Sequence, residues 1–163
     1  MTIPPPRHCL LVVDDEPNIC EAVRDHLRLD YRVLTAHSAA EGTRLMAEHE
    51  VHIVMTDQRM PYTTGVQLLE SVRARFPQAV RMLFTGYSDT ASIIAAINQG
   101  HIFAFLKKPW EPEELDAIVR EAAAEYDRIV EQIIENARLR AEVDDLRQRV
   151  AALEAATAGR EGG

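Results

Sequence analysis

Five short apolar runs alternate with segments of helical spacing, and this alternation constrains the fold more than any other feature. The runs are aliphatic or β-branched, which is typical of strands buried on both faces of a sheet. Strands that alternate with helices imply a parallel sheet with helices on both faces. The sequence therefore predicts an α/β fold with a doubly wound parallel sheet. The predicted strands are Cys9–Val13, Tyr31–Thr35, His52–Thr56, Arg81–Thr85 and Ile102–Leu106.

The intervening segments carry helix-start and helix-stop signals. Pro17 is suited to the first turn of one helix, and Ser38 with Glu41 forms a capping-box pattern at the start of another. A third predicted helix, Gly65–Phe76, stops before a proline, and a last one starts near Pro112.

Composition excludes several functional classes. The net charge of -8 and the pI near 5.2 argue against direct nucleic-acid binding. No stretch approaches the roughly 18 apolar residues of a membrane span. Cys9 and Cys20 lack CxxC spacing and are expected to be inert thiols of a reducing compartment. We therefore expect a cytoplasmic protein with no membrane and no direct nucleic-acid contact.

Polar residues follow four of the predicted strands, where sites form in sheets of this kind. Asp14 and Asp15 follow the first strand, Asp57 the third, Thr85 closes the fourth, and Lys108 follows the fifth. Converging carboxylates repel each other, and a hard cation such as Mg²⁺ relieves that repulsion. A carboxylate can be a nucleophile toward phosphorus, and phosphoryl transfer needs mainly positioning and charge neutralisation. Each residue alone has an ordinary alternative role, such as helix capping by the acidic pair, but their joint placement indicates a phosphoryl-transfer site.

These residues resemble the receiver (CheY-like) family of two-component response regulators. The resemblance covers about residues 8–125 and implies a flavodoxin-like (βα)5 fold with strand order 2-1-3-4-5. The segments that carry it are Leu-Val-Val-Asp14-Asp15-Glu16-Pro17, Met-Thr-Asp57-Gln-Arg-Met-Pro61 with Gly65, Leu-Phe-Thr85-Gly86 and Phe105-Leu-Lys-Lys108-Pro109.

The resemblance also implies a role for each site residue. Asp57 is the expected phosphoacceptor, and the expected Mg²⁺ ligands are Asp14, Asp15, Asp57 and the backbone carbonyl of Arg59. Lys108 is expected to contact the phosphoryl group, and its bond to Pro109 is expected to be cis. Thr85 and the aromatic Phe105 are expected to switch position.

The implied function is that of a response regulator in a two-component phosphorelay. A histidine kinase or phosphotransfer protein is the expected partner, and the domain is expected to signal rather than to act as an enzyme. Phosphorylation is expected to switch the face of the last βα elements and the helix that follows. Arg59 and Tyr87 are bulky and are expected to slow autodephosphorylation, and Trp110 is expected to pack as a structural anchor.

The C-terminal segment has no proline or glycine after Pro112 as far as Ala156. Its later part fits a heptad repeat. Such a pattern predicts a parallel two-stranded coiled coil, and hence a homodimer, with one asparagine setting the register. Opposite charges at the flanking positions favour parallel pairing: Glu135 with Arg140, Glu142 with Arg147, and Arg149 with Glu154. A solvated single helix remains the alternative. The predicted seam is Ile129, Asn136, Val143 and Val150 at a, with Leu139, Leu146 and Leu153 at d.

The predicted organisation has four parts: a disordered stretch at 1–7, the receiver domain at 8–125, the coiled-coil helix at 126–156 and a frayed tail at 157–163. Two other functions compete with a phosphorylation switch. An aspartyl-phosphate phosphohydrolase is disfavoured because Arg59 stands where those enzymes usually have a second aspartate. A degenerate receiver acting as a constitutive dimerisation scaffold is disfavoured by the intact set of acidic residues, threonine and lysine.

Overall fold

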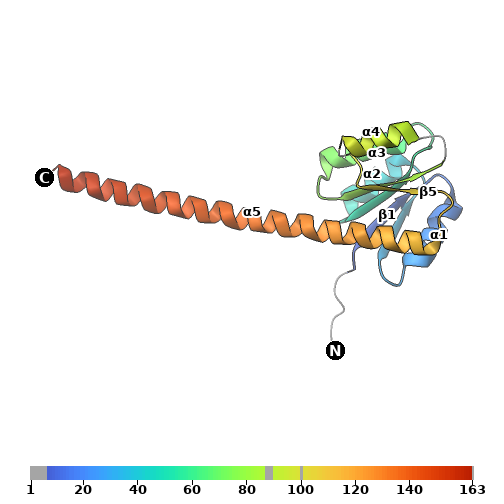
Figure 1. Cartoon of the computed structure of the whole chain (residues 1–163), viewed down its shortest axis with the longest axis horizontal. Helices are drawn as coiled ribbons and strands as arrows, with labels where there is room; N and C mark the ends of the chain where they lie inside the picture. The colour runs from blue at the N-terminus through green and yellow to red at the C-terminus, as the bar shows by residue number, and fades with distance from the viewer. Residues whose placement is uncertain (1–6, 87–89, 100, 163) are drawn as a thin grey trace, which may run out of the picture. The chain divides into compact units, whose positions relative to one another are not determined.

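A computed structural model describes residues 7–86, 90–99 and 101–162. Its sheet has five parallel strands in the order β2-β1-β3-β4-β5, which confirms the predicted fold (Figure 1). The strands are β1 (Cys9–Val13), β2 (Arg32–Ala36), β3 (Ile53–Asp57), β4 (Val80–Thr85) and β5 (Ala104–Lys107). The helices are α1 (Pro17–Leu27), α2 (Ala39–Glu48), α3 (Gly65–Arg75), α4 (Thr90–Asn98) and α5 (Pro112–Glu161).

The core lies on both sides of the two central strands. Every residue of β1 and β3 is buried, as expected for apolar strands covered on both faces. Helices α2, α3 and α4 cover one face of the sheet, and α1 with the first part of α5 covers the other (Figure 1). On that second face His26 Nε2 lies 2.8 Å from Asp116 Oδ1, which joins α1 to α5.

The strand boundaries differ slightly from the predicted ones. β3 is shifted by one residue, so that Asp57 is its last residue and lies opposite Phe84 of β4. β5 begins at Ala104 rather than Ile102. The preceding chain is instead tied across to β4, because Arg81 Nε donates to the carbonyl of His101 at 2.9 Å.

Helix starts follow the capping signals with one difference. Ser38 Oγ accepts from the Glu41 N–H at 3.1 Å, but the Glu41 carboxylate takes the N–H of His37 and so leaves the predicted capping box half formed. A complete box forms instead at α3, between Thr64 and Gln67.

Gly65 lets α3 begin in contact with the end of β3. A Cβ at this position would lie 2.3 Å from the Asp57 carbonyl oxygen and 2.7 Å from Leu83 Cδ1. Only a residue without a side chain fits so close an approach. The glycine therefore fixes the loop that follows Asp57.

Both cysteines are buried, and their thiols are held in the protonated form. Burial raises the pKa of Cys9, and it raises the pKa of Cys20 to about 11, with the Asp14 carboxylate adding to the effect. Because the thiolate is the reactive species, this agrees with the expectation of inert thiols.

The chain divides into two compact units, Met1–Tyr126 and Asp127–Gly163. In the first unit, α5 buries Leu115, Val119, Ala122 and Ala123. The second unit continues the helix to Glu161 rather than ending it at Ala156, since Ala155, Ala156 and Ala158 are strong helix formers. The predicted disordered stretch lies outside the described residues except for Arg7, which donates to the carbonyl of Arg28. Within the described residues, no helix is long and apolar enough to cross a membrane.

Candidate functional site

Three carboxylates meet at the carboxyl edge of the sheet. Oxygen atoms of Asp14, Asp15 and Asp57 lie within 4.8 Å of one another. Asp14 is fully buried and Asp57 nearly so, whereas Asp15 is exposed. Asp14 and Asp15 follow β1 and Asp57 ends β3, so the adjacent central strands bring them together.

Lys108 bridges two of these carboxylates. Its Nζ lies 2.9 Å from Asp14 Oδ2 and 3.1 Å from Asp57 Oδ1. The other oxygen of Asp14 accepts the Glu16 N–H at 2.9 Å, so this carboxylate is held at both ends. The Lys108–Pro109 bond is cis, as the resemblance implied, and the neighbouring Lys107 is exposed.

Burial and neighbouring charges shift the pKa values of both Asp57 and Lys108. Burial raises the pKa of Asp57, and the Asp14 carboxylate adds to that rise, against the opposing effect of Lys108. Burial alone would lower the pKa of Lys108, but its hydrogen bonds to Asp14 and Asp57 outweigh burial and raise it. We conclude that the ammonium stays charged and that it does not fully offset the cost of ionising Asp57.

The donor set fits Mg²⁺. Carboxylate oxygens are hard ligands of the kind this ion prefers, and it commonly binds through one or two carboxylates with waters and phosphate oxygens. The Lys108 ammonium balances one negative charge, while three carboxylates share the edge. An added divalent cation would relieve the remaining repulsion.

The two predicted switch residues differ in their surroundings. Thr85 is buried, and its hydroxyl donates to the carbonyl of Gly86 at 2.9 Å. Phe105 on β5 is 42% exposed. Arg59 lies in the exposed loop after β3, and Tyr87 lies outside the described residues.

Sequence reasoning missed two residues that support the site. Gln58 uses its side-chain oxygen to accept the Val66 N–H at 3.0 Å, and its carbonyl accepts the Gly65 N–H at 3.0 Å, so it ties α3 to the end of β3. Phe84 lies under the Lys108 ammonium, 5.9 Å from Nζ to the ring centroid. Its position one residue before Thr85 was the available signal, because the ends of β4 and β5 are neighbours.

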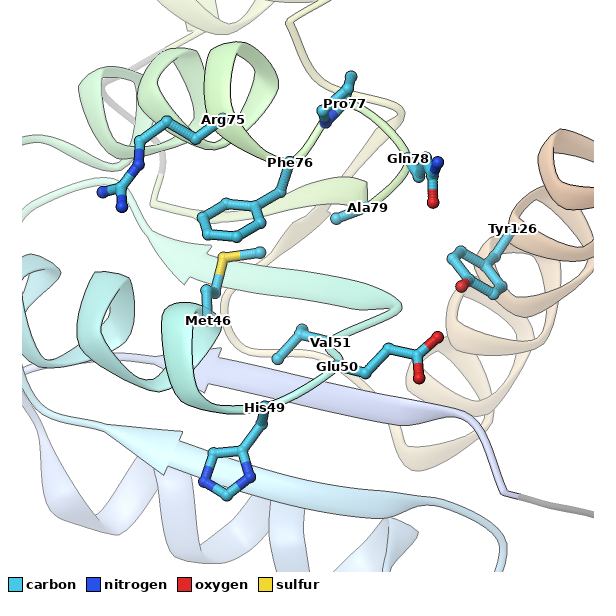
Figure 2. Close-up of a pocket in the computed structure, with 10 residues that line it drawn as sticks. All are labelled: Met46, His49, Glu50, Val51, Arg75, Phe76, Pro77, Gln78, Ala79 and Tyr126. Atoms are coloured by element: carbon cyan, nitrogen blue, oxygen red, sulfur yellow. The ribbon is translucent and has the colours of Figure 1, made fainter. Parts of the chain in front are cut away.

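A separate cavity of about 340 Å³ lies at the opposite edge of the sheet (Figure 2). Met46, Val51 and Phe76 supply its apolar part, with Tyr126 of α5 on one side. It is remote from the acidic edge, because these residues lie at the helix ends and strand starts rather than at the strand ends. None of the predicted site residues lines it.

Fold and strand order together define the class of protein. A five-stranded parallel sheet in the order 2-1-3-4-5, with alternating helices, is the CheY-like receiver fold. Residues 10–120 match the response regulator receiver domain family.

Individual relatives agree with this match. The hydrogenase transcriptional regulatory protein HoxA of Bradyrhizobium diazoefficiens is 42% identical over 117 residues, which are 72% of this chain and 24% of HoxA. Response regulator Rre1 of Synechocystis is 34% identical over 142 residues, covering 85% of this chain and 61% of Rre1. A receiver-domain crystal structure from Clostridium thermocellum is 31% identical with a TM-score of 0.66, covering 71% of this chain and 93% of that one.

This chain therefore belongs to the response regulator receiver domain family and is a component of two-component signalling. The chain spans only 24% of the length of HoxA. Receiver domains are signalling domains rather than classical enzymes, they generally bind Mg²⁺ at an acidic site, and they take their signal from a histidine kinase or phosphotransfer protein.

Proposed function

We propose that this chain is a phosphorylation switch in which Asp57 accepts a phosphoryl group from a histidine kinase or phosphotransfer protein. The observation that carries the proposal is the grouping of Asp57 with two further carboxylates and with the Lys108 ammonium at 3.1 Å. A nucleophilic carboxylate beside a fixed cation is what phosphoryl transfer to an aspartate requires.

We assign the Mg²⁺ ligands to Asp14, Asp15, Asp57 and the backbone carbonyl of Arg59. Bound Mg²⁺ would neutralise negative charge on the phosphoryl oxygens as transfer proceeds. Asp14 is already oriented for this role, because both of its oxygens are engaged by fixed donors.

The chain's own residues perform the rest of the reaction. An Asp57 oxygen forms a bond to phosphorus while the bond from phosphorus to the donor breaks, and that bond's electron pair leaves with the donor group. Lys108 then stabilises a phosphoryl oxygen. The Thr85 hydroxyl exchanges its bond to the Gly86 carbonyl for one to the phosphoryl group, and Phe105 turns inward from its exposed position.

This rearrangement is the proposed switch. It changes the face formed by α4, β5 and α5, where Ile94, Phe103 and Phe105 are exposed. Since α5 is one continuous helix from Pro112 to Glu161, a change at its start can bias the pairing of its later part.

The later part of α5 is proposed to form a parallel homodimer. Along the predicted seam, Leu139, Val143, Leu146, Val150 and Leu153 are each at least 44% exposed. A regular row of exposed apolar side chains is typical of a coiled-coil seam. Within one helix Glu135 pairs with Arg138 at 2.7 Å, so its proposed pairing with Arg140 of a second copy competes with a local ion pair.

Three finer proposals concern the rate of dephosphorylation, the cellular compartment and nucleic-acid contact. Arg59 follows Asp57 by two residues and Tyr87 follows Thr85 by two, and we propose that both bulky side chains slow loss of the phosphoryl group. The cytoplasm is the proposed compartment, because buried free thiols at Cys9 and Cys20 suit a reducing environment. The net charge of -8 supports the absence of direct nucleic-acid contact by these 163 residues, although HoxA is named a transcriptional regulatory protein.

Intact-mass spectrometry after incubation with acetyl phosphate and Mg²⁺ tests the proposal. We expect one phosphoryl adduct on the wild type and none on Asp57→Asn. Omitting Mg²⁺ should abolish the adduct on the wild type. An unmodified wild type that still binds Mg²⁺ would instead favour a dimerisation scaffold.

A further inference from the structure

An aromatic pair lies beside the lysine of the site. The indole of Trp110 stacks on the ring of Phe84, with centroids 4.8 Å apart and planes 15° apart. The Lys108 ammonium lies over the same Phe84 ring, 5.9 Å from its centroid. Trp110 is the sole tryptophan of the chain and follows Lys108 by two residues.

Phe84 is itself fixed to the strand that carries Asp57. Its side chain is completely buried, and in the sheet it is paired with Asp57 of β3. Its carbonyl accepts the Gln58 N–H at 3.2 Å. The ring therefore has a defined position relative to Asp57, and whatever packs on the ring shares that position.

The lysine needs such a support because its stem is flexible. Lysine carries its charge on a four-carbon chain with many rotamers, and holding that chain in one geometry costs conformational entropy. Lys108 also divides its hydrogen bonds between Asp14 and Asp57, so its ammonium has two competing partners. An aromatic face attracts an ammonium within about 6 Å, most strongly when both are partly desolvated. The Lys108 side chain is only 21% exposed, which meets that condition.

We propose that Trp110 is a positioning residue for phosphoryl transfer, which acts by stacking on Phe84 and thereby keeping the Lys108 ammonium between Asp14 and Asp57. This rests on the proposed function of Asp57. A positioning role differs from a purely structural role of Trp110, because only the positioning role predicts that the aromatic character of residue 110 controls the reaction rate.

The first test compares phosphorylation rates of the wild type, Trp110→Leu and Trp110→Phe with acetyl phosphate at saturating Mg²⁺. Trp110→Leu removes the ring that stacks on Phe84 and leaves Phe84 in place. If the ammonium then leaves the Phe84 ring, the rate should be about three- to tenfold lower, the size of a cation–ring contact of this class. Trp110→Phe keeps a ring and is expected to react within about twofold of the wild type. Mg²⁺ affinity, measured by calorimetry, should be the same in Trp110→Phe as in the wild type, because Lys108 keeps its place between Asp14 and Asp57.

The second test needs no phosphorylation. The chain contains only two lysines, Lys107 and Lys108, so a sample labelled with ¹³C-lysine gives two side-chain spin systems. Lys107→Arg assigns them, and exposed Lys107 is the internal reference in the wild type. We expect the ε-methylene resonance of Lys108 to be displaced by the Phe84 ring. That displacement should shrink in Trp110→Leu and persist in Trp110→Phe.

The two tests separate the proposals. If the wild type takes up no phosphoryl group, the proposed function fails, while the lysine spectra still decide whether Trp110 positions Lys108. An unshifted Lys108 resonance in the wild type, or spectra that Trp110→Leu leaves unchanged, would overturn the positioning role. It would also be overturned by a Trp110→Leu rate equal to the wild type, or by a Trp110→Phe rate as low as that of Trp110→Leu.

Discussion

At the scale of single residues, the site places three carboxylates beside one lysine. Asp57 is buried beside Asp14, and burial raises its pKa although Lys108 is 3.1 Å away. Burying an ionised Asp57 at the end of β3 therefore lowers the stability of the folded protein. Such a trade is common where a group must be reactive.

The substitution Asp57→Asn tests how much stability the ionised Asp57 costs. Because the pKa of Asp57 is raised, the folded protein holds its proton more tightly than the unfolded chain does. The unfolding free energy of the wild type should therefore fall, relative to that of the variant, as pH rises from the ordinary value of 3.8 through the raised pKa. Without divalent ions, the difference in unfolding free energy between the two proteins should therefore shift in favour of the variant between pH 3.8 and pH 7.

Urea titrations at several pH values in the presence of a chelator check this. Asp25→Asn changes an exposed aspartate of α1 and serves as the control for loss of one carboxylate. Added Mg²⁺ should stabilise the wild type more than Asp57→Asn. A difference between the two proteins that does not change with pH would contradict the inferred cost of ionising Asp57.

The two adjacent lysines provide a matched pair of substitutions. Lys108→Ala removes the shared partner of Asp14 and Asp57, and we expect it to cost about 2 kcal/mol of unfolding free energy at pH 7 and to abolish phosphorylation. Lys107→Ala, at an exposed position, should change stability by no more than about 0.5 kcal/mol. Equal effects of the two substitutions, measured by urea unfolding, would show that the ion pairs of Lys108 contribute nothing specific.

At the scale of the elements, the contact between α3 and β3 holds the loop that follows Asp57. Two hydrogen bonds from the start of α3 to Gln58 hold the helix against the strand end. The capping box of Thr64 and Gln67 fixes where that helix begins. The loop after Asp57 is thus held by an element that is not part of the acidic cluster.

Gly65→Ala should disturb this contact. The added Cβ would meet the Asp57 carbonyl at 2.3 Å, and because backbone must move to relieve the overlap, we expect a loss of about 2 kcal/mol or more in thermal or urea unfolding. Phosphorylation should slow as well, since the displaced atoms belong to Asp57. Gly159→Ala is the matched control, because its Cβ meets nothing within 4 Å, and it should not lower stability. A Gly65→Ala protein as stable and as reactive as the wild type would show that the loop can shift freely.

At the scale of the whole molecule, the second unit carries an apolar stripe that a single chain leaves exposed. The second unit, Asp127–Gly163, has no core of its own in a single chain, because the described residues from 131 onward are all exposed. A lone helix of this kind is only marginally stable in water unless its apolar stripe is covered. A second copy covers it in the proposed dimer.

Leu146→Glu and Ile134→Glu test the proposed seam. Both residues are exposed apolar side chains of the second unit, but only Leu146 occupies a seam position, whereas Ile134 lies outside it. We expect Leu146→Glu to weaken dimerisation at least about tenfold in sedimentation equilibrium, because it places two carboxylates in an apolar seam. Ile134→Glu should leave dimerisation within about twofold of the wild type. Equal weakening by both would show that the seam is misplaced, and a monomeric wild type would show that α5 is a solvated single helix.

Much of this protein could be read from its sequence by itself. The alternation of apolar runs with helical segments determined the sheet, because buried parallel strands and their helices impose different periods on the chain. The placement of Asp14, Asp15, Asp57, Thr85 and Lys108 after the strands determined which edge carries the polar cluster, since parallel strands all end at one edge. Neither inference needed a distance.

Only the tertiary structure decided how those residues meet. Lys108 divides its ammonium between Asp14 and Asp57, and this depends on the register of β5 against β4 and on burial, which no local pattern encodes. The stack of Phe84 with Trp110 could not be predicted for the same reason, because their packing joins β4 to the segment after β5. The sequence thus determined which groups share an edge of the sheet, and long-range packing decided which of them touch.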